Sequence, residues 1–346
     1  MRRVDDPRDL AASVASAAKE AGAAFGDGSV YLERYIERAR HVEVQLLGDE
    51  AGTVVAIGER DCSTQRRHQK LVEEAPAAGL DTGQRRHLHQ LAVEVARTVG
   101  LVNAATAEFL LSESGELWFL EVNARLQVEH GVTELVSGLD LVHEQLWLAA
   151  GRPLSADALR AAERASEPSG HAIEVRLSAE DPARDFAPAP GTISRWRAPA
   201  GPGVRMDSGV AEGSEVSTFY DPLLAKLLVH AADRPRAIQR LRRALDELEV
   251  GGVQTTLPFH RWLVDQPGFA DATDLATDFV ARAWRPTELV AQAALAAADA
   301  VAATARAQAP DRLRPPSARS GEERPEPDGG AWWRAGIAER MTDGWP

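Results

Sequence analysis

The chain has 346 residues, more than one hydrophobic core of roughly 250 to 300 residues usually supports, so two domains are expected. Its 52 acidic against 39 basic side chains give a formal net charge of -13, which argues against a nucleic-acid binder. The single cysteine, Cys62, excludes an internal disulfide and favours a reducing, cytoplasmic setting. No signal peptide and no membrane span are expected, because no stretch is long and apolar enough.

Hydrophobic periodicity predicts helices and strands along the first half of the chain. We expect helices over 9–25, 82–99 and 132–150, a strand over 30–35, and two hairpins, one joining 42–46 to 54–57 and one joining 105–111 to 117–122. Val42, Val44 and Leu46 alternate with polar residues, a pattern typical of a half-buried strand.

The Ala/Glu/Ser-rich segment 151–169 is the predicted domain boundary. Beyond it we expect strands over 171–177 and 191–196 and a helix over 236–248 that buries Ile238, Leu241, Leu245 and Leu248. An Ala-rich helix is predicted over 285–308. The Pro/Arg/Glu-rich stretch that follows has too little apolar surface to fold alone, which predicts disorder.

Alternating polar residues follow the second hairpin. On a strand Glu121 and Asn123 share a face, and Glu108 lies on the neighbouring strand, although the sequence leaves their register open. Their oxygens suit a hard cation such as Mg²⁺, and a solvated strand face is the alternative. Further along, the planar guanidinium of Arg125 suits a carboxylate or bicarbonate, and Glu129 is a candidate general base.

Residues 59–70 carry six charged side chains directly after a predicted buried strand. We expect a loop whose basic groups bind an anion, most economically a polyphosphate, with a solvated charge run as the alternative. Lys70 and His68 are the first candidates. Cys62 is interpreted as a small packed residue because no base can be assigned to it.

The strand predicted over 171–177 places its apolar residues on one face and Glu174 and Arg176 on the other. Taken alone, these two residues are predicted to form a surface ion pair. The arginines of the helix over 236–248 are interpreted as a solvated helical face.

Three motifs, taken together and in order, resemble the biotin carboxylase family, the ATP-grasp component of acyl-CoA carboxylases that also occurs in pyruvate carboxylase. They are ERDCS with QRRHQK and EEAP over 59–76, EVNARLQVEH over 121–130, and GHAIEVR with AEDP over 170–182. The resemblance covers roughly residues 1–285. It implies an α+β fold, with a partial ATP-grasp domain over 1–150, the boundary segment 151–169, a biotin carboxylase C-terminal domain over 170–285, and a tail over 286–346.

The resemblance implies a ligase that uses ATP and bicarbonate, through carboxyphosphate, to carboxylate biotin held on a carrier protein. It assigns each candidate residue a role. Glu108, Glu121 and Asn123 would hold Mg²⁺ or Mn²⁺; Arg125, Gln127 and Val128 would bind bicarbonate and Glu129 would deprotonate it; Lys70 would meet carboxyphosphate and Arg176 the biotin enolate; Glu33, Ile36, His41, Gln65 and His68 would line the ATP site. The implied partners are a biotin carboxyl carrier domain, a carboxyltransferase subunit and a second copy of the chain.

Measured against the family, the sequence starts after the glycine-rich phosphate loop, with an incomplete lid, and stops before the biotin carrier domain. We therefore expect the isolated chain to be weakly active or inactive. A non-catalytic remnant that dimerises or docks on a carboxylase complex is the alternative. Another bicarbonate-using ATP-grasp ligase, such as carbamoyl-phosphate synthetase, is disfavoured because the RLQVEH motif and residues 170–285 match the biotin enzymes.

Overall fold

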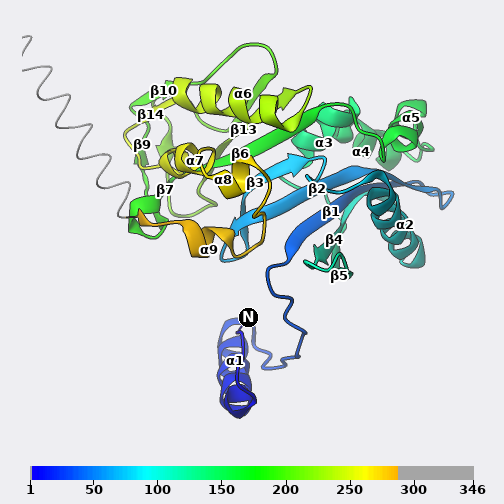
Figure 1. Cartoon of the computed structure of the whole chain (residues 1–346), viewed down its shortest axis with the longest axis horizontal. Coiled ribbons are helices and arrows are strands. Elements are labelled where there is room, and N and C mark those ends of the chain that lie inside the picture. Colours follow the sequence, from blue (N-terminus) through cyan, green and yellow to red (C-terminus); the bar gives the residue numbers. More distant parts are fainter. Residues whose placement is uncertain (1, 287–346) are drawn as a thin grey trace, which may run out of the picture. The chain divides into compact units, whose positions relative to one another are not determined.

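The structure is a computed structural model that describes residues 2–286 (Figure 1). The tail, and all but the first two residues of the helix predicted over 285–308, lie outside the described residues. One antiparallel sheet of eight strands organises the chain, in the order β11-β13-β6-β3-β2-β1-β4-β5. Its strands are β1 (Arg40–Gly48), β2 (Val54–Arg66), β3 (Gln69–Ala75), β4 (Asn103–Leu111), β5 (Leu117–Asn123), β6 (His171–Ser178), β11 (Val204–Ser208) and β13 (Leu223–Ala231).

Helices cover both faces of this sheet, as Figure 1 shows for α2 on one side and α3 to α5 on the other. The helices are α1 (Leu10–Phe25), α2 (Thr82–Thr98), α3 (His130–Ser137), α4 (Leu141–Ala149), α5 (Ala156–Arg164), α6 (Arg234–Glu247), α7 (Leu257–Leu263), α8 (Pro267–Ala270) and α9 (Phe279–Ala283), with single 3₁₀ turns η1 (Pro7–Asp9) and η2 (Pro182–Arg184). Short strands complete the second half: β7 (Glu180–Asp181), β8 (Ala187–Pro188), β9 (Gly191–Thr192), β10 (Arg195–Arg197), β12 (Glu215–Val216) and β14 (Glu249–Gly251).

Both predicted hairpins are confirmed, but the prediction that the first strand is half-buried is wrong. Val42, Val44 and Leu46 of β1 pack in the core under α2, as their alternation predicts. Glu43 and Gln45, on the opposite face, are each 0% exposed. Helices on both sides of the sheet therefore bury the polar face of β1 as completely as its apolar face.

Two further predictions about secondary structure are wrong. Residues 30–35 form no strand, and Tyr31 is 82% exposed, because no neighbouring strand supplies hydrogen-bond partners for this segment. The helix predicted over 132–150 is two helices. Gly138, at φ 73°, ends α3 in a left-handed conformation, and the Asp140 carboxylate accepts from the His143 N–H to begin α4.

The second half of the chain builds on the same sheet. Its helix α6 buries Ile238, Leu241 and Leu245 against β13 and β6, as predicted. Strands from both sides of the boundary predicted over 151–169 join the one sheet, and the described residues 2–286 belong to one compact unit. Among the described residues, every helix is too short or too polar to cross a lipid bilayer.

A buried ion network ties β3 to β6 and α6. The carboxylate of Glu74 lies 2.7 Å from His171 Nε2 and accepts a hydrogen bond of 2.6 Å from Arg234 Nε. Burial raises the pKa of Glu74, but the hydrogen bonds from His171 and Arg234 and their charges outweigh burial and lower this pKa to about 2.

We expect this network to make the fold sensitive to acid. The folded-state pKa of Glu74 is lower than its ordinary value of 4.5, so its contribution to stability is complete above that value and is lost as pH falls towards about 2. Urea unfolding between about pH 5 and pH 3 measures the loss. Glu74→Gln is expected to be less stable at neutral pH and to lose less stability over that range, whereas equal losses in both proteins would contradict the assignment.

Candidate functional site

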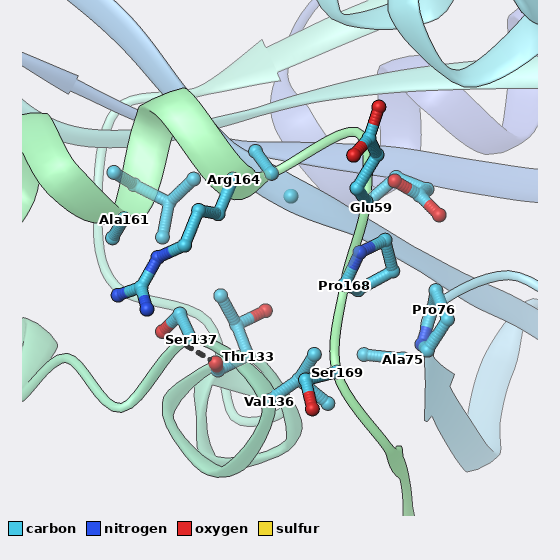
Figure 2. A pocket seen from close by; sticks show the side chains of 14 residues that line it. Glu59, Ala75, Pro76, Thr133, Val136, Ser137, Ala161, Arg164, Pro168 and Ser169 are labelled. Carbon is cyan, nitrogen blue, oxygen red and sulfur yellow. Dashed lines mark hydrogen bonds between the residues drawn. The ribbon is translucent and has the colours of Figure 1, made fainter. Parts of the chain in front are cut away.

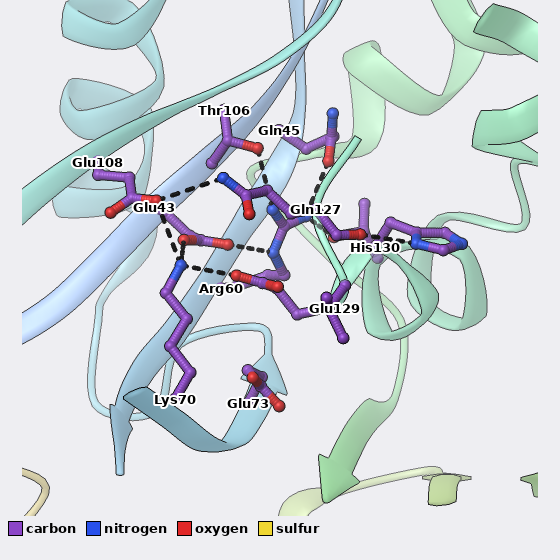
Figure 3. Close-up of polar contacts among 12 residues, drawn as sticks. Glu43, Gln45, Arg60, Lys70, Glu73, Thr106, Glu108, Gln127, Glu129 and His130 are labelled. Atoms are coloured by element: carbon purple, nitrogen blue, oxygen red, sulfur yellow. Dashed lines mark hydrogen bonds and ion pairs between the residues drawn. The ribbon is translucent and has the colours of Figure 1, made fainter. Parts of the chain in front are cut away.

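The sheet face beneath the N-terminus of α3 carries a continuous group of polar side chains, which we call the polar cluster; Figure 3 labels its members other than Glu174 and Arg176. Antiparallel register creates it, because Glu43 lies opposite Arg60 on β2 and opposite Glu108 on β4. On β3 and β6, Glu73 lies opposite Glu174. The cluster consists of Glu43, Gln45, Arg60, Lys70, Glu73, Thr106, Glu108, Gln127, Glu129, Glu174 and Arg176.

Arg60 joins four elements at the centre of the polar cluster. Its guanidinium is 0% exposed and donates to Glu43 Oε1 at 2.6 Å, to Gln45 Oε1 at 2.9 Å, to Thr133 Oγ1 of α3 at 3.0 Å and to Thr106 Oγ1 at 3.2 Å. Burial opposes the charge of Arg60, but the Glu43 carboxylate outweighs burial and raises the pKa of Arg60. The arginine therefore remains a cation that fixes α3 over the sheet.

Lys70 brings three carboxylates to one point. Its Nζ donates to Glu43 Oε2 and to Glu129 Oε1, each at 2.6 Å, and to Glu108 Oε1 at 3.2 Å. Burial would lower the pKa of Lys70, but the surrounding acidic groups raise it above its ordinary value. The prediction that residues 59–70 form a loop is wrong, because β2 runs on to Arg66 and β3, which carries Lys70, begins at Gln69.

Glu129 is held by two cations. It is 0% exposed, and besides Lys70 it accepts a hydrogen bond of 2.9 Å from Arg176 Nη2. The Nε of the same arginine donates to Glu73 Oε1 at 2.6 Å. The prediction of a surface ion pair between Glu174 and Arg176 is therefore wrong, since Glu174 is buried and the partners of Arg176 lie on other elements.

The three predicted cation ligands lie together. Glu108 and Glu121 are directly opposite each other on β4 and β5, which is the register that the sequence left open. Asn123 Nδ2 donates to both carboxylates, at 3.0 and 2.9 Å. Burial raises the pKa of Glu108, but hydrogen bonds from His41 and Lys70 and their charges outweigh burial and lower it to about 2, so this carboxylate is ionised. An oxygen set with two carboxylates fits a hard divalent cation.

The predicted bicarbonate ligands lie next to Glu108 and Glu129. Arg125 is exposed and its Nη1 donates to Gln127 Oε1 at 3.0 Å, while Gln127 Nε2 donates to Glu108 Oε1 at 3.5 Å. The carbonyl oxygen of Val128 accepts from Lys226 Nζ at 2.7 Å. These residues are close in sequence, and the structure adds that Arg125 and Gln127 are hydrogen-bonded to each other and that Gln127 contacts the predicted cation ligand Glu108.

The predicted ATP-site residues are only partly brought together. His41 is buried, with Nε2 2.8 Å from Glu108 Oε2, and Gln65 lies opposite Lys70 in the β2–β3 pair. His68 is exposed in the turn between these strands. The other two candidates, Glu33 and Ile36, lie in the irregular segment before β1, and no hydrogen bond between described residues links them to the polar cluster.

Sequence analysis did not identify five residues of this region as site residues: Glu43, Arg60, Glu73, Glu174 and Lys226. All five lie on strands of the sheet. For Glu43 and Glu174 the available signal is the alternation of polar with apolar residues along a strand, which predicts a half-buried strand and a surface ion pair. Arg60 falls in the predicted charged loop, and no pattern assigns a role to Glu73 or Lys226.

A separate pocket lies between α3, α5, the first half of β2 and the end of β3 (Figure 2). Its lining includes Thr133, Ser137, Arg164 and Ser169. The exposed guanidinium of Arg164 makes one hydrogen bond among the described residues, to the carbonyl of Arg160 at 3.3 Å. None of the predicted site residues lines this pocket, so the polar cluster is the candidate functional site.

Comparison with known proteins defines the class of each half of the chain. Residues 1–157 match the ATP-binding domain of the carbamoyl-phosphate synthase L chain, and residues 174–282 match the biotin carboxylase C-terminal domain. The sheet and the polar cluster each contain residues from both matched segments.

Individual relatives agree with these matches. A biotin carboxylase from Nostoc sp. is 46% identical over 280 residues, which cover 81% of this chain and 61% of the relative. The alpha3 subunit of a biotin-dependent acyl-coenzyme A carboxylase from Mycobacterium leprae is 46% identical over 275 residues, covering 79% of this chain and 45% of the relative. The structure of a Campylobacter jejuni biotin carboxylase in complex with β,γ-ATP superposes with a TM-score of 0.76 at 43% identity, covering 82% of this chain and 61% of that one.

The chain belongs to the biotin carboxylase family. The predicted resemblance and the predicted α+β fold, an ATP-grasp-type domain followed by the biotin carboxylase C-terminal domain, are thereby confirmed. The chain spans about three-fifths of the length of the Nostoc relative.

Proposed function

We propose that the polar cluster binds bicarbonate beside MgATP and activates it for transfer to biotin, as part of a biotin-dependent carboxylase. One observation carries this proposal: a fully buried carboxylate, Glu129, lies between two cations, Lys70 and Arg176. A base next to fixed positive charge is what deprotonation of a small anion requires. The names of the relatives support the proposal, since each relative is called a biotin carboxylase or a subunit of a biotin-dependent carboxylase.

In this proposal Glu129 accepts the proton of bicarbonate, and the freed oxygen attacks the γ-phosphorus of ATP while ADP leaves. The cations Lys70 and Arg176 offset the charge on carboxyphosphate, and Arg176 then stabilises the biotin enolate. Arg125, Gln127 and Val128 orient bicarbonate. Because the two cations are already held by carboxylates in the absence of substrate, they need little rearrangement to meet the reacting anion.

The cation site and the nucleotide site are proposed from the same set of residues. Glu108, Glu121 and Asn123 would hold Mg²⁺ or Mn²⁺, which neutralises phosphate charge when bound. For Asn123, the amide would have to rotate so that its oxygen faces the cation, because its nitrogen now donates to both carboxylates. The adenine and phosphates of ATP would contact Glu33, Ile36, His41, Gln65 and His68.

The wider setting is also proposed from the family. The partners would be a biotin carboxyl carrier domain, a carboxyltransferase subunit and a second copy of the chain. We retain the division into residues 1–150, 151–169, 170–285 and 286–346 as a proposal about domains, supported by the two family matches on either side of the boundary segment.

Phosphate release from MgATP tests the proposed function. The sequence predicts weak activity at most, and we expect the phosphate that the purified chain does release to appear faster with bicarbonate than without it, and faster again when free biotin is added. Equal release under all three conditions by a folded chain would contradict a catalytic role and would favour a non-catalytic partner in a carboxylase complex.

A further inference from the structure

Carboxyl groups outnumber cations in the polar cluster. Its five carboxyl groups are those of Glu43, Glu73, Glu108, Glu129 and Glu174. Three cations, Arg60, Lys70 and Arg176, donate hydrogen bonds to four of the five. His41 lies 2.8 Å from Glu108, and even a protonated imidazole there would leave one carboxyl group in excess. Because isolated buried charge is very costly, this excess favours a proton on one carboxyl group of the cluster.

Glu174 is the carboxyl group without a cation of its own. It is 0% exposed, and neither of its oxygens has a hydrogen-bond partner among the described residues. A Cβ added at Gly131, in the first turn of α3, would lie 3.4 Å from Glu174 Oε2, so the helix closes over this carboxyl group. Its cross-strand neighbours are Leu228 on β13 and Glu73 on β3.

Other charged groups near Glu174 do not supply a direct partner. Lys226 on β13 donates to the carbonyl of Val128 and lies 3.6 Å from Asp207, while Arg176 is occupied by Glu73 and Glu129. Burial raises the pKa of Glu174 well above its ordinary value, and the charge of Glu73 raises it further. Burial also raises the pKa of Glu73, but the charge of Arg176, whose Nε donates to Glu73 at 2.6 Å, opposes this shift.

We propose that Glu174 is a protonated carboxylic acid in the native protein, so that the pair of Glu73 and Glu174 carries one negative charge, on Glu73. A neutral Glu174 leaves Glu73 ionised, and ionised Glu73 fixes the guanidinium of Arg176 against Glu129. Glu73 and Glu174 are thus positioning residues: Glu73 on β3 holds the guanidinium of Arg176 on β6, and Glu174 sets the charge of Glu73. This inference deepens the proposed function, because its catalytic consequence requires Arg176 to meet the substrate.

The geometry predicts a pH window for the arginine. At low pH the pair binds a second proton, on Glu73, and the neutral Glu73 no longer holds the guanidinium of Arg176. At high pH Glu174 ionises, and two adjacent carboxylates then compete with Glu129 for the guanidinium. Glu174→Gln, which mimics the neutral acid, is expected to keep Arg176 in place and to remove the high-pH limit.

Infrared spectroscopy tests the proton directly and does not depend on activity. A protonated carboxyl group has a carbonyl band that a carboxylate lacks. We expect this band in the wild-type chain at neutral pH, its displacement when glutamate is labelled with ¹³C, and its loss in Glu174→Gln. Glu163→Gln, an exposed residue of α5, is the matched control and should retain the band. Absence of the band from the wild type, or its persistence in Glu174→Gln, would overturn the proposal.

Stability gives a second readout with a defined sign. A carboxyl group with a raised folded-state pKa binds its proton more tightly in the native state. The stability that this proton gives the fold is therefore lost as pH rises above the unfolded-state pKa of about 4.5. Replacing Glu174 by glutamine removes one such proton. The pH dependence of the unfolding constant between about pH 5 and pH 7 should therefore become weaker by up to tenfold per pH unit. An unchanged slope would contradict a protonated Glu174.

Kinetics then separate this inference from the proposed function. With turnover present, Glu73→Gln is expected to raise the KM for biotin because Arg176 loses a partner, and Glu174→Gln is expected to extend activity to higher pH. A chain without bicarbonate-dependent turnover would contradict the proposed function alone, since the infrared and stability results would still decide the protonation of Glu174.

Discussion

Replacement of Arg60 by methionine is expected to lower the free energy of unfolding by about 3–5 kcal/mol, the typical cost of removing one partner of a buried ion pair. Arg60 makes four hydrogen bonds, and without it the carboxylate of Glu43, which is 0% exposed, would keep only Lys70. The contact to Thr133 that fixes α3 over the sheet would also be lost. Urea unfolding followed by circular dichroism measures the change.

Arg86→Met is the matched control for this variant. Arg86 pairs with Glu167 at 2.8 Å, and both side chains are exposed, so its loss should cost less than about 1 kcal/mol. Addition of Glu43→Gln to Arg60→Met should recover part of the lost stability, because the uncompensated charge is removed. Equal losses for Arg60→Met and Arg86→Met would show that the buried arginine does not organise the cluster.

The strands and helices that patterning predicts well are those whose apolar face alone decides their position. The helices α2 and α6 and the strands of the second hairpin begin and end within a few residues of their predicted bounds, whereas β2 runs on to Arg66, far beyond its predicted end at residue 57. The break between α3 and α4 escaped prediction because apolar spacing continues across Gly138 and Asp140. The strand prediction over 30–35 is wrong because local β propensity does not supply a pairing partner, and these residues have no neighbouring strand.

The candidate site shows a different limit of sequence patterning. The motifs identify Lys70 and Glu129, and the neighbouring strands of a predicted hairpin identify Glu108, but polar alternation on a strand predicts exposure to water. In the folded chain the polar faces of neighbouring strands lie side by side under α3, so residues such as Glu43 and Glu174 are buried by tertiary structure. Burial of this kind depends on which strands become neighbours, and β6 joins β3 across nearly 100 residues of sequence.

The same burial makes Glu129 the residue with the largest expected effect on activity. Its carboxylate is the only proton acceptor that the described cluster places between Lys70 and Arg176. A positioned general base contributes typically 10²- to 10⁴-fold to rate, so Glu129→Gln should reduce bicarbonate-dependent phosphate release at least about 100-fold. The amide has nearly the same shape, and it removes the basic oxygen while leaving an acceptor for one of the two cations.

The most direct measurement compares phosphate release from MgATP by the wild type, Glu129→Gln and Glu163→Gln, each with and without bicarbonate. Glu163 is an exposed residue of α5 that lies outside the polar cluster, and its substitution should leave the bicarbonate-dependent rate unchanged. The predicted result is a bicarbonate-dependent rate in the wild type and in Glu163→Gln that Glu129→Gln lowers at least about 100-fold. A bicarbonate-dependent rate in Glu129→Gln equal to that of the wild type would contradict the role of Glu129 as the base.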